Sequence, residues 1–110
     1  MTIYRLSDTC AVSSQIQPRD VAALAAEGFT TIICNRPDGE DFGQPTAAAV
    51  ADECAAHGVA FHNIPIDRSG LTMDRVERFR DAVAASTGPV LAYCRSGQRS
   101  SVIWQASGSP

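Results

Sequence analysis

Cys94 stands where an apolar strand gives way to a helix, and arginines follow it at short intervals. The apolar run 90–93 (Val-Leu-Ala-Tyr) precedes the cysteine, and the sequence Cys-Arg-Ser-Gly-Gln-Arg-Ser continues to Ser100. A short loop that ends at a helix start directs successive backbone N–H groups toward one point, where the helix dipole adds partial positive charge. Both effects favour a thiolate on Cys94, which is the form in which cysteine acts as a nucleophile.

The charge around this loop supports a reactive cysteine over an inert thiol buried in the core. The segment 88–110 contains no acidic residue, although the whole chain has a formal net charge of −3. A cysteine that merely fills a core needs neither flanking arginines nor a glycine in the turn. We expect Cys94 and Arg99 to be catalytic, with the Ser100 hydroxyl donating to the sulfur. The other residues of the loop expected to bind an anion are Arg95, Ser96, Gly97 and Gln98.

All nine basic residues of the chain are arginine. The absence of lysine excludes Schiff-base chemistry and a Walker-type phosphate loop. Anion recognition must therefore use guanidinium groups and backbone amides, which suit planar or tetrahedral oxyanions. The negative net charge argues against nucleic acid as the main partner, so we expect a small-molecule substrate and no cofactor.

Strand-like and helical segments alternate along the chain, whose 110 residues suffice for a single domain (1–110). This alternation predicts an α/β fold with a mostly parallel central sheet flanked by helices. Ligands bind such sheets at the carboxyl ends of the strands, which is where Cys94 lies, in the loop between the last strand and the following helix. The predicted strands are 3–6, 11–16, 30–34, 60–64 and 90–93, and the predicted helices are 18–27, 46–57, 72–87 and 100–106.

Local signals define the ends of these helices. Pro18 is predicted at the first helical position, while Thr46 and Thr72 are predicted N-caps. Gly28 is expected to end the first helix. In the third helix, the side expected to pack carries Met73, Val76, Phe79, Arg80 and Val83.

The remaining candidate ligands are better explained by packing. Cys54 and His57 lie one helical turn apart and His62 follows on the next strand, but a metal site needs further converging ligands. We therefore expect a buried cysteine and a surface histidine, and no metal site. Trp104 is expected to fill the core behind the last helix. No apolar stretch is long enough to span a bilayer, and without a secretory signal we expect a cytoplasmic protein with reduced thiols.

The segment 93–100 resembles the active-site loops of two enzyme families. Cysteine phosphatases of the tyrosine and dual-specificity type carry His-Cys-x-x-Gly-x-x-Arg-Ser/Thr, with five residues between cysteine and arginine. Rhodanese-type sulfurtransferases commonly carry Tyr-Cys-Arg-x-Gly-x-Arg-Ser. The chain matches the rhodanese pattern at every position, with four residues between Cys94 and Arg99.

A longer resemblance covers most of the chain. Residues 33–40 (Ile-Cys-Asn-Arg-Pro-Asp-Gly-Glu), 63–67 (Asn-Ile-Pro-Ile-Asp) and 88–91 (Gly-Pro-Val-Leu) are similar to the bacterial phosphatase-like domain family of β-lactamase-hydrolase-like proteins. The resemblance implies a dual-specificity-phosphatase-like fold. It also implies a domain that occurs alone or joined to a metallo-hydrolase-like persulfide dioxygenase, either as a partner or as a fused domain.

Asp67 lies 27 residues before Cys94 (94 − 67), in a loop where the cysteine phosphatases that the chain resembles keep their general acid. A carboxylic acid in that position could protonate the leaving oxygen of a phosphate monoester. Sulfur transfer needs no such acid. The alternative is a loop aspartate that caps the local turn with Ser69 and Gly70.

Arg36 follows the predicted strand 30–34 and could reach the same rim of the sheet. There it could bind thiosulfate, sulfite or a glutathione carboxylate. The alternative is a salt bridge to Asp38 or Glu40, which loop arginines commonly form.

The length of the loop favours sulfur transfer, because each residue adds an inward N–H and widens the circle that these groups describe. Six residues from Cys94 to Arg99 leave room for one sulfane sulfur, whereas a phosphoryl group needs a wider circle. We therefore expect a rhodanese-type sulfurtransferase that forms a persulfide on Cys94 and passes the sulfur to a small thiophilic acceptor. One alternative is a phosphatase that forms a phosphocysteine on Cys94, with Asp67 as general acid. Another is a module that binds or senses an oxyanion without turnover.

Overall fold

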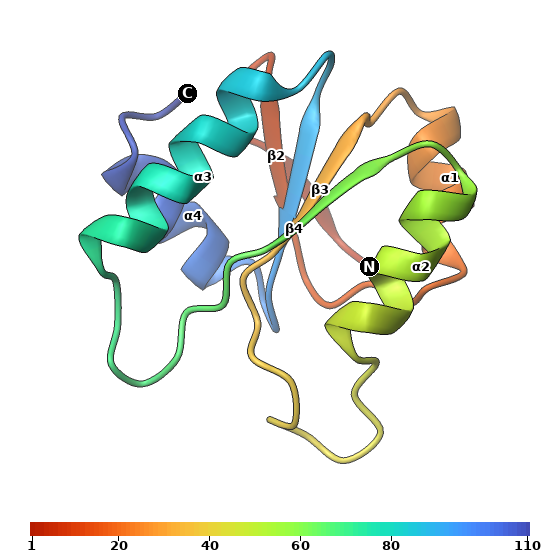
Figure 1. The fold of residues 1–110 in the computed structure, drawn as a ribbon, viewed down its shortest axis with the longest axis horizontal. Coiled ribbons are helices and arrows are strands. Elements are labelled where there is room, and N and C mark those ends of the chain that lie inside the picture. Colours follow the sequence, from red (N-terminus) through yellow and green to blue (C-terminus); the bar gives the residue numbers. More distant parts are fainter.

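The computed structural model describes residues 1–110 as one five-stranded sheet with four helices (Figure 1). The strands follow the order β1-β2-β5-β3-β4 across the sheet. Only β1 is antiparallel to its neighbour, so the predicted α/β fold with a mostly parallel sheet is confirmed. The strands are β1 (Ile3–Arg5), β2 (Cys10–Ser13), β3 (Thr31–Cys34), β4 (Ala60–Asn63) and β5 (Val90–Tyr93).

The four parallel strands end level with one another. Ser13 of β2 and Cys34 of β3 both lie opposite Tyr93 of β5, and Cys34 also lies opposite Asn63 of β4. The chain therefore leaves all four strands at the same edge of the sheet. In Figure 1 the long loops that follow β3 and β4 lie at this lower edge, together with the loop between β5 and α4.

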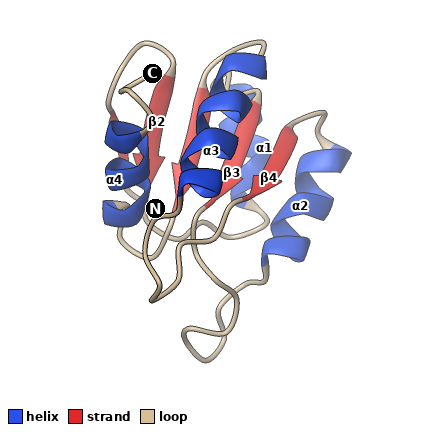
Figure 2. Cartoon of the chain, turned by 60° about the vertical axis from the view of Figure 1, so that its left-hand side comes forward, coloured by secondary structure: helices blue, strands red, loops and turns tan.

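Helices cover both faces of the sheet (Figures 1 and 2). The helices α1 and α2 cover one face, and α3 and α4 cover the other. The hydroxyls of Thr46 and Thr72 accept hydrogen bonds from the N–H groups of Ala49 and Arg75, so both predicted N-caps are confirmed. The helices are α1 (Asp20–Ala26), α2 (Ala47–Ala56), α3 (Met73–Ala85) and α4 (Gln98–Ala106).

Alternate residues of the central strand face two separate cores. Leu91 of β5 packs in the cluster that contains Leu24 of α1, while Ala92 packs in the cluster that contains Phe79 of α3 and Ile103 of α4. All five side chains are fully buried. Burial of each large apolar side chain contributes about 1.5–3 kcal/mol to the stability of the fold. The two cores therefore hold the strands in place, and with them the sheet edge from which the loops extend.

The first helix begins later than predicted. It starts at Asp20 rather than Pro18, because the Asp20 carboxylate accepts the Gln17 N–H at 2.7 Å. The N–H groups of Asp20 and Val21 bond to the carbonyls of Gln17 and Pro18, which forms a turn before the helix. The strand β2 also ends at Ser13, three residues earlier than predicted.

The packing of α3 and α4 differs in part from the prediction. Met73 is 73% exposed and Arg80 is exposed, so their expected place on the packed side is wrong; the buried contacts come from Phe79 and Ala82. Trp104 is only partly buried, against the core under α3 and α4. None of the four helices has the length and apolar character needed to cross a membrane.

Candidate active site

The loop between β5 and α4 bends around the Cys94 sulfur. Cys94 is buried, and the Gly97 N–H donates to its Sγ at 3.1 Å. Gly97 has a φ of 98°, in the left-handed region, and a Cβ at this position would lie 3.4 Å from the Ser13 carbonyl oxygen. Glycine therefore allows the chain to turn into α4 while its N–H faces the sulfur.

Other N–H groups of this segment have no oxygen acceptor, and those of Ser96 and Ser100 face the Cys94 sulfur. Those of Arg95, Ser96, Arg99 and Ser100 donate to no carbonyl and to no side-chain oxygen. The Gln98 N–H, in contrast, donates to the Ser96 hydroxyl at 3.3 Å. Gln98 was expected to bind an anion, but its N–H has this other acceptor in the structure. The first turn of α4 thus adds donors to those of the loop itself.

The pKa of Cys94 lies below that of an ordinary cysteine even though its side chain is buried. Burial is the largest single influence and raises the pKa, but the backbone N–H groups of Ser100, Gly97 and Ser96, together with the Ser100 hydroxyl, outweigh it and lower the pKa. At Cys10, where burial acts alone, the pKa rises to about 12. Cys94 is therefore the thiol of this chain best suited to act as a nucleophile.

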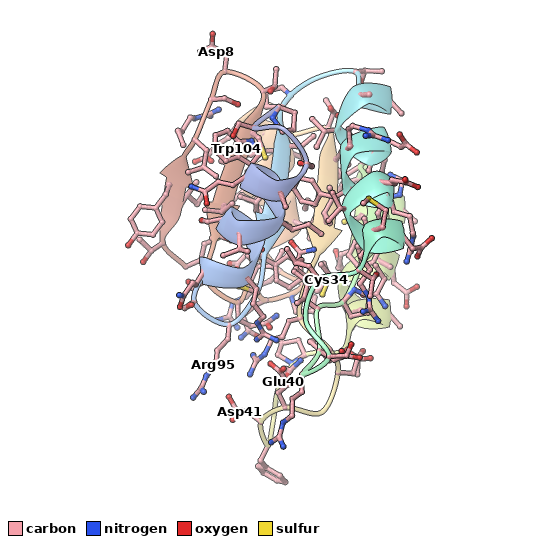
Figure 3. The ribbon with its side chains drawn as sticks, turned by 90° about the vertical axis from the view of Figure 1, so that its left-hand side faces the viewer. Asp8, Cys34, Glu40, Asp41, Arg95 and Trp104 are labelled. Atoms are coloured by element: carbon pink, nitrogen blue, oxygen red, sulfur yellow. The ribbon has the colours of Figure 1, made fainter.

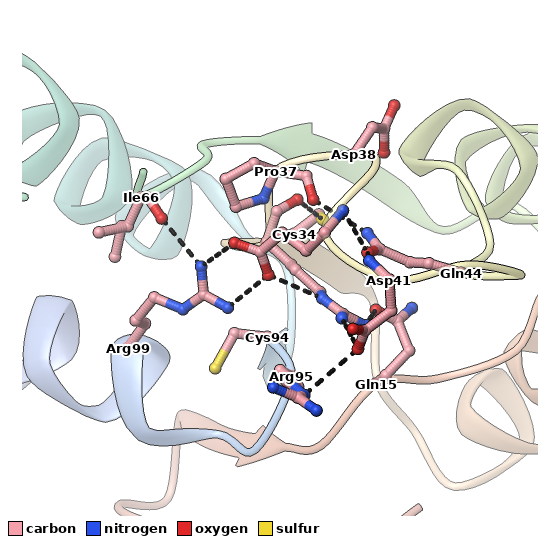
Figure 4. A network of polar contacts seen from close by, with 12 residues as sticks. Gln15, Cys34, Pro37, Asp38, Asp41, Gln44, Ile66, Cys94, Arg95 and Arg99 are labelled. Atoms are coloured by element: carbon pink, nitrogen blue, oxygen red, sulfur yellow. Dashed lines mark hydrogen bonds and ion pairs between the residues drawn. The ribbon is translucent and has the colours of Figure 1, made fainter. Parts of the chain in front are cut away.

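Arg99 points its guanidinium along the sheet edge beside Cys94 (Figure 4). Its two terminal nitrogens donate to both carboxylate oxygens of Glu40, each at 2.8 Å, and Nη1 also donates to the Ile66 carbonyl at 3.0 Å. Its Nε–H forms no hydrogen bond to an oxygen. One edge of the guanidinium is thus held by the protein, and the other edge is available to an anion.

Glu40 is the residue of this site whose role the sequence reasoning missed, since it was considered only as a partner of Arg36. Its carboxylate bridges two arginines, Arg99 and Arg36, the latter at 2.9 Å. The hydrogen bond from Arg99 contributes most to lowering the pKa of Glu40 to about 2, against some opposition from burial. Glu40 is therefore ionised throughout the physiological range and fixes the position of Arg99.

Arg36 is a structural residue rather than an open anion ligand. It is 3% exposed, and its three nitrogens donate to Glu40, Asp41 and the side chain of Gln15. Of the two salt-bridge partners considered for Arg36, Glu40 is therefore confirmed. Asp38 is not a partner, because its carboxylate accepts the Ala47 N–H at the start of α2.

Glu40 and Asp41 belong to residues 38–44, here called the acidic loop. Asp41 also pairs with Arg95 across the site, at 3.3 Å (Figures 3 and 4). The Gln44 side chain fixes the loop by accepting the N–H groups of Glu40 and Asp41 and donating to the Pro37 carbonyl. The acidic loop is thus held by its own hydrogen bonds and presents two carboxylates to the arginines of the site.

Asp67 lies on the loop after β4, next to the residue whose carbonyl binds Arg99. Its carboxylate accepts hydrogen bonds from the N–H and hydroxyl of Ser69 and lies 3.6 Å from Arg75. The Gly70 N–H bonds to the Asp67 carbonyl, which closes the turn. The hydroxyl of Ser69 contributes most to the lowered pKa of Asp67, so this carboxyl is ionised in the turn. In this structure Asp67 therefore caps its local turn with Ser69 and Gly70, which is the alternative to a role as general acid.

The Ser100 hydroxyl lies against the Cys94 sulfur and helps to lower the pKa of the thiol, as expected. Its Oγ also lies 2.8 Å from the Asn35 side-chain oxygen, to which it donates. Asn35 is fully buried, and its amide donates to the Ile64 carbonyl at 2.9 Å. It thereby joins the ends of β3 and β4 to α4. A polar residue directly after a buried strand was the signal that could have identified it.

The other candidate ligands lie away from the loop and helix start formed by residues 94–100, here called the cradle. Cys54 is buried on α2 and the exposed ring of His57 is hydrogen-bonded to the Glu53 carbonyl, as predicted for a buried cysteine and a surface histidine. Burial is the main cause that raises the pKa of Cys54 to about 11, and the charge of Glu53 adds to it.

Residues 3–109 match the family described as the phosphatase-like domain of beta-lactamase hydrolase-like proteins. The chain belongs to this phosphatase-like domain family. A beta-lactamase hydrolase-like protein of Agrobacterium fabrum is 31% identical over 104 residues, which cover 94% of the chain and 24% of that protein. The chain therefore spans about a quarter of the length of the curated relatives that it matches.

Solved structures of similar fold include bacterial proteins described as candidate phosphatases. One from Neisseria meningitidis is 37% identical and superposes with a TM-score of 0.85, covering 100% of this chain and 81% of that one. One from Shewanella putrefaciens, at 20% identity and a TM-score of 0.78 over 96% of this chain and 66% of that one, shares the fold. These findings support the phosphatase alternative for this phosphatase-like domain rather than the sulfurtransferase that the loop length favoured.

Proposed function

We propose that the chain is a cysteine-dependent phosphatase that acts on a small phosphate monoester, with residues 1–110 as one catalytic domain. The observation that carries the proposal is the buried Cys94 sulfur, which has a lowered pKa and lies beside the Arg99 guanidinium in a member of a phosphatase-like family. The thiolate supplies the nucleophile, and the free N–H groups and the Nε edge of Arg99 would bind the phosphoryl oxygens.

In the first step, the Cys94 thiolate attacks phosphorus. An S–P bond forms while the bond between phosphorus and the ester oxygen breaks, and the leaving oxygen takes a proton from Asp67. In the second step, water attacks the phosphocysteine and Asp67 takes a proton from it. The S–P bond breaks, which regenerates the thiolate and releases inorganic phosphate.

The role proposed for Asp67 requires this carboxyl to hold a proton when the ester is bound. In the turn with Ser69 its pKa is lowered, so the carboxyl must exchange the Ser69 hydrogen bonds for the ester oxygen. Its position supports this exchange, because the preceding residue, Ile66, already contacts Arg99. The dianionic phosphoryl group would then raise the pKa of Asp67 by its own charge.

The geometry offers more donors than the loop length suggested. The count of six residues from Cys94 to Arg99 omits the N–H group of Ser100, which lies with that of Arg99 in the first turn of α4; both are free of backbone partners. These groups support binding of an anion larger than a single sulfur atom.

Sulfur transfer is the second candidate, because four residues separate Cys94 from Arg99, as in the rhodanese-type loop. The lowered pKa of Asp67 also agrees with a reaction that needs no acid. A persulfide dioxygenase would be the natural partner of such an activity.

Parallel assays with p-nitrophenyl phosphate and with thiosulfate plus cyanide separate the candidates. We expect phosphate release by the wild type and its loss in Cys94→Ala, with Cys54→Ala as the matched control because its buried thiol has a raised pKa. Thiocyanate formation that requires Cys94, without phosphate release, would replace the proposal by sulfur transfer. Anion binding without either activity would indicate a sensor module.

A further inference from the structure

A cavity of about 280 Å³ opens beside Arg99 at the candidate active site. One wall comes from the loop after β4 and the other from the first turns of α4. Arg99 is the only charged residue among those that line it. The lining residues are Ile66, Gly70, Leu71, Gln98, Arg99 and Val102.

The walls of this cavity are apolar on both sides. Leu71 is 37% exposed and Val102 is 44% exposed, so both present aliphatic surface to the cavity. Ile66 is buried, and its carbonyl is already bonded to Arg99. The cavity thus joins exposed aliphatic side chains to the arginine of the cradle.

We infer that this cavity binds the apolar ester group of the substrate, such as an aromatic ring or a branched alkyl chain, while the phosphoryl group occupies the cradle at Cys94. This inference rests on the proposed phosphatase function and adds the chemical class of the substrate. The loop that carries Asp67 also supplies Gly70 and Leu71. The ester oxygen would therefore lie between the cradle and the loop of the proposed acid.

The size and lining of the cavity restrict the ester group. Pockets for drug-sized ligands measure about 300–1,000 Å³, so a cavity of about 280 Å³ suits one ring or a short branched chain. A sugar or nucleoside would lose hydration against Leu71 and Val102, where only Gln98 offers a neutral polar side chain. Apolar monoesters are therefore favoured over polar ones.

Position, rather than size, selects this cavity among those of the molecule. A larger cavity of about 490 Å³ is lined by Thr9, Gly88 and Pro89, which precede β2 and β5 at the edge of the sheet away from Cys94. Another, of about 370 Å³, is lined by Tyr4 of β1 and by Ser96, Gly97 and Gln98 of the active-site loop, but it contains no charged side chain. Only the cavity beside Arg99 includes an arginine of the cradle.

Binding of phenylphosphonate and methylphosphonate, measured by calorimetry, tests the inference without turnover. Both carry the same anionic group and neither is an ester, so only the apolar group differs. We expect phenylphosphonate to bind at least roughly tenfold more tightly, as burial of several apolar carbons implies. Leu71→Asn and Val102→Thr should each reduce that ratio severalfold and leave the Kd of methylphosphonate unchanged. Met73→Gln, a matched change at an exposed apolar residue outside the cavity, should not alter the ratio.

The outcomes separate this inference from the proposed function. If both phosphonates bind with equal affinity, or if neither cavity variant changes the ratio, the cavity does not hold the ester group and the inference is wrong. If neither phosphonate binds, the anion site itself is wrong, and the proposed function falls together with the inference. Because Leu71 and Val102 are partly exposed and lie on different elements, two independent folded variants are expected.

Discussion

Replacing Glu40 by glutamine removes one negative charge from the arginine network while keeping the size of the side chain. The carboxylate accepts two hydrogen bonds from Arg99 and one from Arg36, and Arg36 is almost fully buried. Glutamine can accept with one oxygen only, and it carries no charge. Both guanidinium groups therefore lose an ionic partner, although Arg36 retains Asp41.

The magnitude follows from the pKa of Glu40. The gap between the usual value of 4.5 and about 2 corresponds to at most roughly 3 kcal/mol of unfolding free energy. The side chain of Glu40 is 31% exposed, so solvent screening reduces this figure to about 1–2 kcal/mol. Because the folded pKa is depressed, the contribution is complete well above pH 4.5 and is lost as the pH falls toward 2.

Urea unfolding followed by circular dichroism at pH 7 and near pH 2 measures this contribution. Glu40→Gln should be less stable than the wild type by about 1–2 kcal/mol at pH 7, and the difference should shrink toward zero near pH 2. The control is Glu77→Gln, on the exposed surface of α3, which should change stability by less than about 0.5 kcal/mol. Equal stability of Glu40→Gln and wild type at pH 7, or a difference independent of pH, would refute the ionic role of Glu40.

Three further predictions concern the cradle and the proposed acid. The rate of alkylation of Cys94 should have its pH midpoint below the usual 8.5 of a free thiol, and a midpoint as high as that of Cys10 would remove the basis for a thiolate. Gly97→Ala should lower the unfolding free energy by about 1–2 kcal/mol, because alanine is strained at a φ of 98°; unchanged stability in urea would contradict the left-handed turn. Asp67→Asn should reduce turnover of an alkyl phosphate on the order of a hundredfold with little effect on sulfur transfer, and unaltered phosphate release would exclude Asp67 as the acid.

The fold was largely predictable because its signals are local. Runs of apolar residues bounded by turn residues located the five strands. Thr46 and Thr72 act as N-caps, as their side chains predict. The start of α1 was misjudged because Pro18 suits the first helical position, yet the Asp20 side chain stabilises a turn before the helix. A single side-chain contact of this kind leaves no periodic pattern in the sequence, so it could not be predicted from the spacing of apolar residues.

The site was predictable only where a contiguous motif defines it. The loop around Cys94 lies within seven residues of sequence, whereas Glu40 meets Arg99 from a position 59 residues away. That contact depends on the register that places the ends of β3 and β5 side by side, and the acidic loop itself has no regular structure. The hydrogen bond from Ser100 to Asn35 was missed for the same reason, since the two residues lie 65 positions apart and Asn35 follows β3.

Mass spectrometry of the enzyme quenched in acid during turnover of an aryl phosphate detects the proposed phosphocysteine itself. We expect one phosphoryl group on the peptide that contains Cys94, and none on the peptides that contain the other three cysteines. An unmodified Cys94 during steady, enzyme-dependent phosphate release would contradict the proposed mechanism, because the phosphocysteine is the intermediate through which both proposed steps pass.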